Sequence, residues 1–179
     1  SADGCQSHGN TWNFRRESDS LRKLKNVQSV EGGHSVDVIA RKQGSDEEHA
    51  IKVMGKTDKL NQITIIDGKL PQASGECLVD EWYAQQNDLK KGDVLNLSSG
   101  NEDDLKDTLK DTTYKITGIG GSSEYLSRSR GSTGIGTGTL SGFIVVQPSE
   151  FSSDIYTEVY LTAKGAKQER ATVMLTKTK

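Results

Sequence analysis

Short apolar segments separated by turn-forming residues fill the middle of this sequence, and they limit the folds that the chain can adopt. The clearest of them are Glu76–Val79, Val94–Leu97, Thr113–Ile119 and Phe143–Val146. Gly, Asp and Pro stand between them, as in Asp67-Gly68-Lys69-Leu70-Pro71 and Lys91-Gly92-Asp93. Apolar segments this short, bounded by turn residues, are typical of β-strands. The sequence therefore predicts sheets joined by tight turns.

The remainder of the chain adds strands and few helices. Apolar and β-branched residues predict further strands over Val27–Val30, Ser35–Arg41, His49–Met54, Gln62–Ile66, Thr157–Thr162 and Thr172–Leu175. We expect a helix to begin at Ser18 or Ser20, and one or two helical turns over residues 81–88. Strands outnumber helices, so the predicted class is α+β, with mixed or antiparallel sheets and few short helices.

Length and charge restrict the classes of function. The 179 residues suffice for one domain or for two closely joined lobes. The 23 basic and 25 acidic residues are interleaved and leave a net charge of −2, so nucleic acid is not expected as a partner. No apolar run approaches the roughly 18–20 residues of a membrane span, and no signal peptide is recognised. Ser1-Ala2 is typical of a cloning remnant, so we expect a domain excised from a longer protein.

The two cysteines, Cys5 and Cys77, do not make a disulfide framework. Cys77 lies in a predicted strand, where a small buried hydrophobic side chain is the favoured interpretation. The sequence leaves open whether the two cysteines pair.

Two local motifs match functional signatures, and both lack the required context. The run Gly131–Gly138 could cradle a phosphate, but it has no GK[ST] ending and no helix pattern follows it. We therefore expect a flexible loop. Ser20-Leu21-Arg22-Lys23 matches S-x-x-K, but the companion S-D-N and K-T-G motifs are absent, and Ser20 is better explained as a helix cap.

No metal site, cofactor or catalytic constellation is predicted. The candidate nitrogen and sulfur ligands lack a local ligand spacing, although two of the histidines could meet across a hairpin; they are His8, His34, His49, Cys5 and Cys77. Four carboxylates in the segment Asn101–Asp111 could suggest calcium, but an EF-hand loop does not fit them; they are Asp103, Asp104, Asp107 and Asp111. With Leu105 and Leu109 four residues apart, this segment is expected to be a solvated helix.

Several segments, in order, resemble one family. They are Leu24–Val38 with its Val30-Glu31-Gly32-Gly33, Leu60–Cys77 with Gly68-Lys69-Leu70-Pro71, Tyr125–Gly138, and Phe151 with Tyr156-Thr157-Glu158. Together they resemble the extracytoplasmic domain of FtsX-like (MacB-type) ABC transporter permeases, in their Gram-positive branch. His34 and Lys69 stand where that family usually has tyrosine and arginine. Residues 1–16 do not match the family's usual first strand.

The resemblance implies a location and a role. The domain would lie between the first two membrane helices of a permease, on the outer face of the cell membrane. It would not be an enzyme and would relay conformational change by mechanotransmission. Its partners would be a cytoplasmic ABC ATPase subunit acting through the permease, a second permease subunit and an unknown transported substrate. The alternatives are a secreted surface binding module and a cell-surface hydrolase.

The resemblance also implies a division of the chain within a MacB-like periplasmic core fold. Residues 1–16 would be a poorly ordered arm. Residues 17–60 plus 148–179 would form a membrane-proximal α/β lobe, and residues 61–147 an inserted, mainly-β second lobe.

A glycine-rich surface loop is the candidate contact region. We expect Tyr125–Gly142 to be long, mobile and exposed, because loops on a rigid scaffold often carry function. The candidate contact residues are Tyr125, Arg128 and Arg130. Replacing the two arginines with Ala is expected to leave the melting temperature nearly unchanged and to reduce transport.

Overall fold

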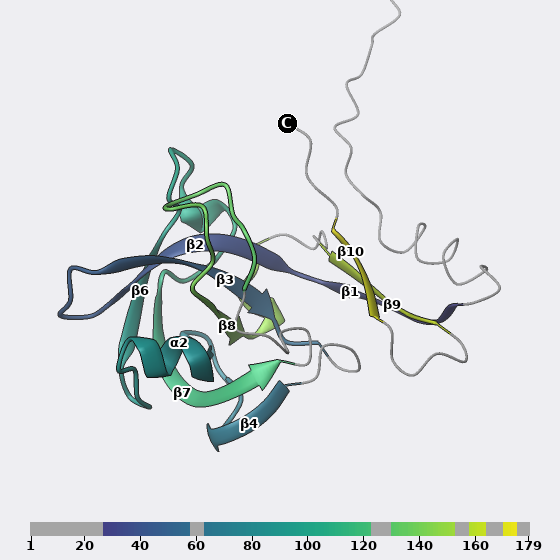
Figure 1. Ribbon diagram of the computed structural model, residues 1–179, viewed down its shortest axis with the longest axis horizontal. Coiled ribbons are helices and arrows are strands. Elements are labelled where there is room, and N and C mark those ends of the chain that lie inside the picture. The colour runs from purple at the N-terminus through teal and green to yellow at the C-terminus, as the bar shows by residue number, and fades with distance from the viewer. Residues whose placement is uncertain (1–26, 58–62, 123–129, 153–157, 164–169, 175–179) are drawn as a thin grey trace, which may run out of the picture. The chain divides into compact units, whose positions relative to one another are not determined.

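Two units make up the chain. The computed structural model describes residues 27–57, 63–122, 130–152, 158–163 and 170–174 (Figure 1). Unit 1 comprises Ser1–Gly32 and Ile155–Lys179, and unit 2 comprises Gly33–Asp154. The arm predicted over residues 1–16 and the helix predicted from Ser18 or Ser20 lie outside the described residues.

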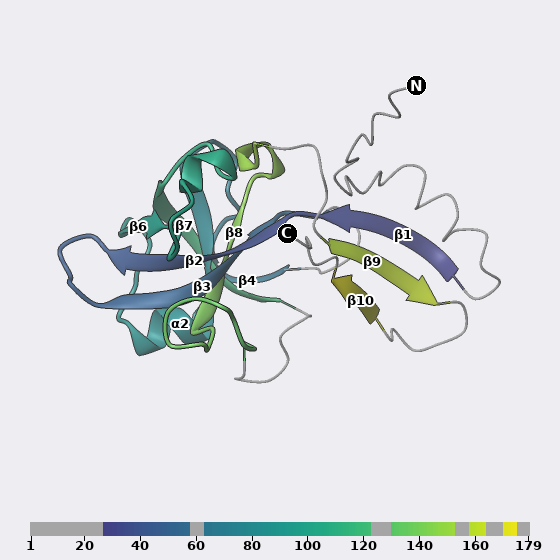
Figure 2. The same cartoon turned by 90° about the horizontal axis from the view of Figure 1, so that it is seen from above.

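Unit 1 contains a three-stranded sheet built from both ends of the chain. Its strands are β1 (Val27–Gly33), β9 (Glu158–Ala163) and β10 (Arg170–Met174). β9 lies between β1 and β10, as Figure 2 shows, and pairs antiparallel with β10. The three strands confirm those predicted from Val27, Thr157 and Thr172, and β1 extends further through the glycine pair Gly32-Gly33.

Six strands of unit 2 close into a ring. They are β2 (Ser35–Lys42), β3 (Glu48–Gly55), β5 (Glu76–Asp80), β6 (Val94–Ser98), β7 (Thr113–Ser122) and β8 (Gly142–Val146). Hydrogen-bonded neighbours follow the order β7-β5-β8-β3-β2-β6, and β6 pairs back with β7. Two of these pairings, β3–β8 and β5–β7, are parallel, whereas the others are antiparallel. The result is a small mixed barrel.

The long strand β7 also carries the seventh strand, β4 (Ile63–Gly68). Near its start β7 pairs with β6, and from Gly118 onward it pairs with β4. A Cβ on Gly118 would lie 2.2 Å from the Lys69 carbonyl oxygen, and a Cβ on Gly120 would lie 2.5 Å from that of Thr64. Glycine at both positions therefore allows the β4 segment to approach closely.

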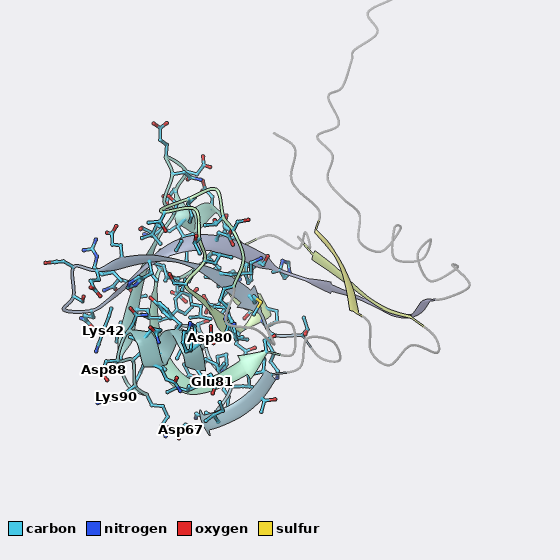
Figure 3. All side chains as sticks on the ribbon, viewed as in Figure 1. Lys42, Asp67, Asp80, Glu81, Asp88 and Lys90 are labelled. Atoms are coloured by element: carbon cyan, nitrogen blue, oxygen red, sulfur yellow. The ribbon has the colours of Figure 1, made fainter. Side chains whose placement is uncertain are left out.

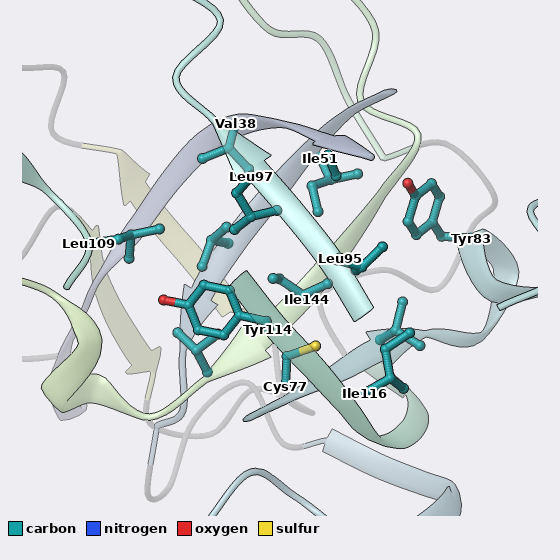
Figure 4. Close-up of a cluster of buried hydrophobic side chains, with 14 of the residues drawn as sticks. Val38, Ile51, Cys77, Tyr83, Leu95, Leu97, Leu109, Tyr114, Ile116 and Ile144 are labelled. Atoms are coloured by element: carbon teal, nitrogen blue, oxygen red, sulfur yellow. The ribbon is translucent and has the colours of Figure 1, made fainter. Parts of the chain in front are cut away.

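The barrel interior is apolar because alternate residues of every strand point inward. Each of the six strands contributes two buried side chains to one cluster, which are Val38, Ala40, Ile51, Val53, Cys77, Val79, Leu95, Leu97, Tyr114, Ile116, Ile144 and Val146 (Figure 4). A second cluster lies on the opposite face of β3, β5 and β8 and comprises Met54, Leu78, Phe143 and Val145. β8 is buried on both faces, which explains its unbroken apolar sequence.

Helices are few and short. The predicted helical turns after residue 80 are confirmed as α2 (Glu81–Gln86), and Asp80 caps the helix by accepting a hydrogen bond from the Trp82 N–H. Within the described ranges no helix is long and apolar enough to cross a membrane.

The expectation of a solvated helix over Asn101–Asp111 is wrong. The segment contains a short 3-10 turn, η1 (Leu105–Asp107), which Asp104 caps by accepting a hydrogen bond from the Lys106 N–H. Leu105 and Leu109 are buried in the main core. Burial of these two leucines, rather than pairing of the charges, fixes the conformation of the segment.

The boundaries between the two units differ from the lobe boundaries that the sequence predicted. Residues 17–60 were expected to belong to the first lobe. Within this range, however, β2 pairs with β6 and β3 pairs with β8, so both strands belong to unit 2. The divisions lie after Gly32 and after Asp154, rather than after residues 60 and 147. A strand pair cannot leave a closed ring without exposing its backbone hydrogen-bonding groups, so β2 and β3 belong to the barrel.

Candidate functional site

The candidate contact loop is described only in its second half. Tyr125 and Arg128 lie outside the described residues. Arg130 is 8% exposed, so the expectation of an exposed side chain is wrong for this residue. We call residues 130–141 the strap.

Arg130 anchors the start of the strap to the end of β5. Its Nε donates to Asp80 Oδ2 at 2.6 Å, and its Nη2 donates to Asp80 Oδ1 at 2.9 Å. The guanidinium carbon lies 5.8 Å from the centre of the Phe143 ring. Asp80 is itself fully buried and also caps α2 (Figure 3). One carboxylate therefore fixes both the helix and the strap, in the bidentate geometry that arginine favours.

The glycine-rich run within the strap folds back on itself. The N–H of Thr133 donates to the Gly138 carbonyl, that of Leu140 donates to the Gly131 carbonyl, and Ser132 bridges Thr139. Gly138 has a φ of +85°, a conformation that suits glycine. These hydrogen bonds hold the glycine-rich run in a compact turn.

The strap also packs against β2 and β3. Thr133 Oγ1 donates to Asp37 Oδ2 at 2.8 Å, and the Ser141 N–H donates to the Ala50 carbonyl at 2.8 Å. Leu140 is buried. The described half of the predicted loop is thus tied to the barrel at both ends.

Two exposed isoleucines on β4 form a candidate contact patch that sequence reasoning missed. Ile65 is 43% exposed and Ile66 is 57% exposed. Within the described residues β4 pairs with β7 alone. Next to them Asp67 of β4, labelled in Figure 3, pairs with Lys91 at 2.8 Å. The sequence predicted a strand over Gln62–Ile66 but gave no sign that two of its isoleucines are exposed.

Glu150 is a buried carboxylate that the sequence did not signal. It lies in η2 (Pro148–Glu150) and is fully buried. Its Oε2 accepts from the Tyr114 hydroxyl at 3.0 Å, and its Oε1 accepts from the Gly75 N–H at 3.1 Å. Burial, and then the negative charge of Glu150, raise the pKa of Tyr114. The phenol therefore stays neutral and keeps donating.

The histidines take part in aromatic contacts. His34 stacks on Phe151 with ring centres 4.9 Å apart, and the Tyr83 hydroxyl lies 3.3 Å from His49 Nδ1. The suggestion that His34 and His49 could meet across the hairpin is wrong, because His49 pairs with Ala40 at the other end of β2. Among the described residues, no group of three or more His, Cys, Asp and Glu could hold a metal ion.

Cys77 is a free thiol in the barrel core. Its side chain is fully buried, and burial raises its pKa. The prediction of a small buried hydrophobic residue is confirmed. Cys5, its suggested partner, lies outside the described residues.

Known structures share this architecture. No protein-family model matches the sequence, and a search of the curated proteins gives no match. The extracellular domain of the noncanonic ABC-type transporter YknZ from Gram-positive bacteria matches with a TM-score of 0.50 and 12% identity, over 86% of this chain and 74% of that one. This chain has the fold of that ABC transporter extracellular domain.

Two further structures are similar to the chain. A domain of a permease protein from Porphyromonas gingivalis matches with a TM-score of 0.48 and 9% identity, over 84% of this chain and 67% of that one. The periplasmic region of MacB from Actinobacillus actinomycetemcomitans matches with a TM-score of 0.47 and 11% identity, over 90% and 74%.

Proposed function

We propose that this chain is a non-catalytic extracellular domain of an ABC transporter permease, which relays conformational change by mechanotransmission. The observation that carries the proposal is the fold shared with the extracellular domain of YknZ. Unit 1 supports it, because β1 comes from one end of the chain and β9 and β10 from the other. A domain inserted between two membrane helices needs its first and last strands together, and unit 1 would be the membrane-proximal lobe.

The buried polar groups of unit 2 support a structural rather than a catalytic role. Asp80 accepts hydrogen bonds from Arg130 and from the first turn of α2. Glu150 accepts hydrogen bonds from Tyr114 and Gly75. Each group thus has hydrogen-bond partners within the fold. A catalytic acid or base instead has to face the reacting group of a substrate.

The partners follow from the proposal. A cytoplasmic ABC ATPase subunit would act on the domain through the permease, and a second permease subunit and a transported substrate would meet it outside the membrane. Tyr125 and Arg128 remain the proposed contact residues. Arg130 instead holds the adjoining strap in place through Asp80.

Two experiments test the proposal: sequencing of the gene on both sides of this segment, and a transport assay of the parent transporter. The coding sequence flanking residues 1 and 179 should encode hydrophobic spans of roughly 20 residues on both sides. In the reconstituted transporter, Arg128→Ala is expected to reduce transport while ATP hydrolysis continues. A signal peptide before residue 1 and a stop codon after residue 179 would instead make the chain a secreted binding module.

A further inference from the structure

The pairing between β5 and β8 is the shortest in the ring. It consists of two residue pairs, Leu78 opposite Val145 and Val79 opposite Ile144. Every other pairing in the ring extends over three to seven residue pairs. We call the β5–β8 pairing the seam. A ring of strands separates most easily where the fewest backbone hydrogen bonds have to break, which in this barrel is the seam.

The next shortest pairing, between β6 and β7, is extended by the residues on either side of it. Beyond its three residue pairs, the Leu97 N–H donates to the Thr112 carbonyl at 2.8 Å, at one end. At the other end the Ile116 N–H donates to the Asp93 carbonyl at 2.9 Å. The β6–β7 ladder is therefore longer than its strand assignment, and the seam remains the weakest ladder of the ring.

The strap forms a second connection from β5 to the far side of the seam. It begins at the end of β5, where Arg130 binds Asp80 through two hydrogen bonds. It then reaches β2, where Thr133 Oγ1 donates to Asp37 Oδ2 at 2.8 Å, before it continues into β8. In the ring, β2 lies beyond β8 and β3 as seen from β5. The strap therefore ties β5 to strands across the seam without using the hydrogen bonds of the seam.

Asp80 is the residue at which the contacts that close the seam meet. It is the last residue of β5, it accepts from the Trp82 N–H at the start of α2, and it binds Arg130. α2 packs across the seam, because a Cβ on Gly142 of β8 would lie 2.3 Å from Tyr83 Cβ. Departure of Arg130 would leave a buried carboxylate without its cation, which is unfavourable. The strap and α2 thus hold the seam through the same carboxylate.

We propose that the seam is where the barrel opens and that the strap is the latch that keeps it closed, fastened by Arg130 on Asp80 and by Thr133 on Asp37. The inference concerns unit 2 alone and does not depend on the proposed function. Opening would expose the edges of β5 and β8 and the thiol of Cys77, which lies in β5 with its side chain in the core (Figure 4). A partner that binds the released strap more tightly than the fastened one would shift the barrel toward the open state.

Alkylation of Cys77 in the full chain, in a Cys5→Ser background, tests the latch. Iodoacetamide can reach the buried thiol only when the barrel opens, so the slow rate of modification over a long incubation measures the open fraction. Thr133→Val keeps the shape of the side chain and removes its hydrogen bond to Asp37. Because that bond is made to a charged group, its loss is expected to raise the rate roughly tenfold.

Thr113→Val is the matched control. Thr113 Oγ1 also donates to a side chain on a neighbouring strand, Asn96 Oδ1 at 3.2 Å, but this bond crosses the β6–β7 pairing. The control is expected to leave the rate nearly unchanged. An unchanged rate in Thr133→Val, or an equal rise in Thr113→Val, would overturn the latch.

Urea distinguishes opening of the seam from unfolding of the whole chain. Local opening exposes little surface, so the rate in Thr133→Val is expected to rise with urea less steeply than the unfolded fraction measured on the same variant. A rate that follows the global unfolding equilibrium at every urea concentration would mean that Cys77 is reached by unfolding alone, and would also overturn the latch.

Discussion

Asp80 and Arg130, which are 50 positions apart in the sequence, form a two-point ion pair buried between the end of β5 and the strap. The Arg130 side chain is 7% exposed and that of Asp80 is not exposed at all. The cost of removing two charges from water largely offsets their attraction, so a buried ion pair adds little net stability. Its main effect is to fix the positions of the two side chains. The pair therefore specifies where the strap begins.

Arg130→Met is expected to destabilise unit 2 by about 3–5 kcal/mol, because it leaves the Asp80 carboxylate buried without its partner. Urea unfolding measures the loss. The double variant Asp80→Asn with Arg130→Met should lose less, since it contains no unpaired buried charge. A single variant as stable as the wild type would show that the pair does not form. This prediction replaces the expectation that changing Arg130 leaves the melting temperature nearly unchanged.

Gly142→Ala is expected to cost roughly 1–3 kcal/mol through overpacking. A Cβ at this position would lie 2.3 Å from Tyr83 Cβ, where α2 packs against β8. Gly134→Ala in the strap is the control, because a Cβ there would meet nothing within 4 Å. Comparable melting temperatures for the two variants would mean that α2 does not pack against β8 as described.

Stability should fall in alkaline solution in a way that depends on Tyr114. Burial and the nearby Glu150 charge raise the pKa of Tyr114 above its value in the unfolded chain, which is about 10. The stabilisation is complete below that pH and is lost as the pH rises above it, because the unfolded chain then releases the proton first. Tyr114→Phe is expected to make the decline of the unfolding free energy above about pH 10 shallower. Parallel declines in wild type and variant would contradict this.

Cys77 should resist alkylation in the native chain. Its thiol is buried and its pKa is raised, so little of the reactive thiolate forms and reagents cannot reach it. In a Cys5→Ser background, iodoacetamide is expected to modify no cysteine natively and one in denaturant, as mass spectrometry would count. Native modification at a rate typical of a free thiol would place Cys77 outside the core.

Local sequence patterns predicted the strands, but they could not predict how the strands assemble. Turn residues on either side of Glu76–Val79 and Val94–Leu97 mark β5 and β6 because their effect on the backbone is local. The ring also needs pairings between strands far apart in the sequence, such as Val53 of β3 opposite Ile144 of β8, and no local pattern encodes these. The fold resemblance was predictable because it rests on several ordered segments together.

The candidate site was less predictable for the same reason. A solvated loop arginine and a buried anchor look alike in sequence, so the role of Arg130 became visible only when Asp80 lay beside it. Leu105 and Leu109 are spaced as on a helix, but only Leu105 lies in the 3-10 turn, Leu109 bridges to Phe151, and both are buried in the core. In both cases burial by distant residues decided the outcome.

The position of β8 in the ring has a consequence for biogenesis. β8 pairs with β3 on one side and with β5 on the other, yet it is the last strand of the barrel to be synthesised. A nascent chain that ends before Gly142 therefore lacks the strand that joins the two halves of the ring. Pairings between segments so distant in sequence form slowly, because long loops have to close first. We expect the ribosome to release residues beyond 146 before the barrel can close, so shorter translation intermediates would expose unpaired strand edges to chaperones.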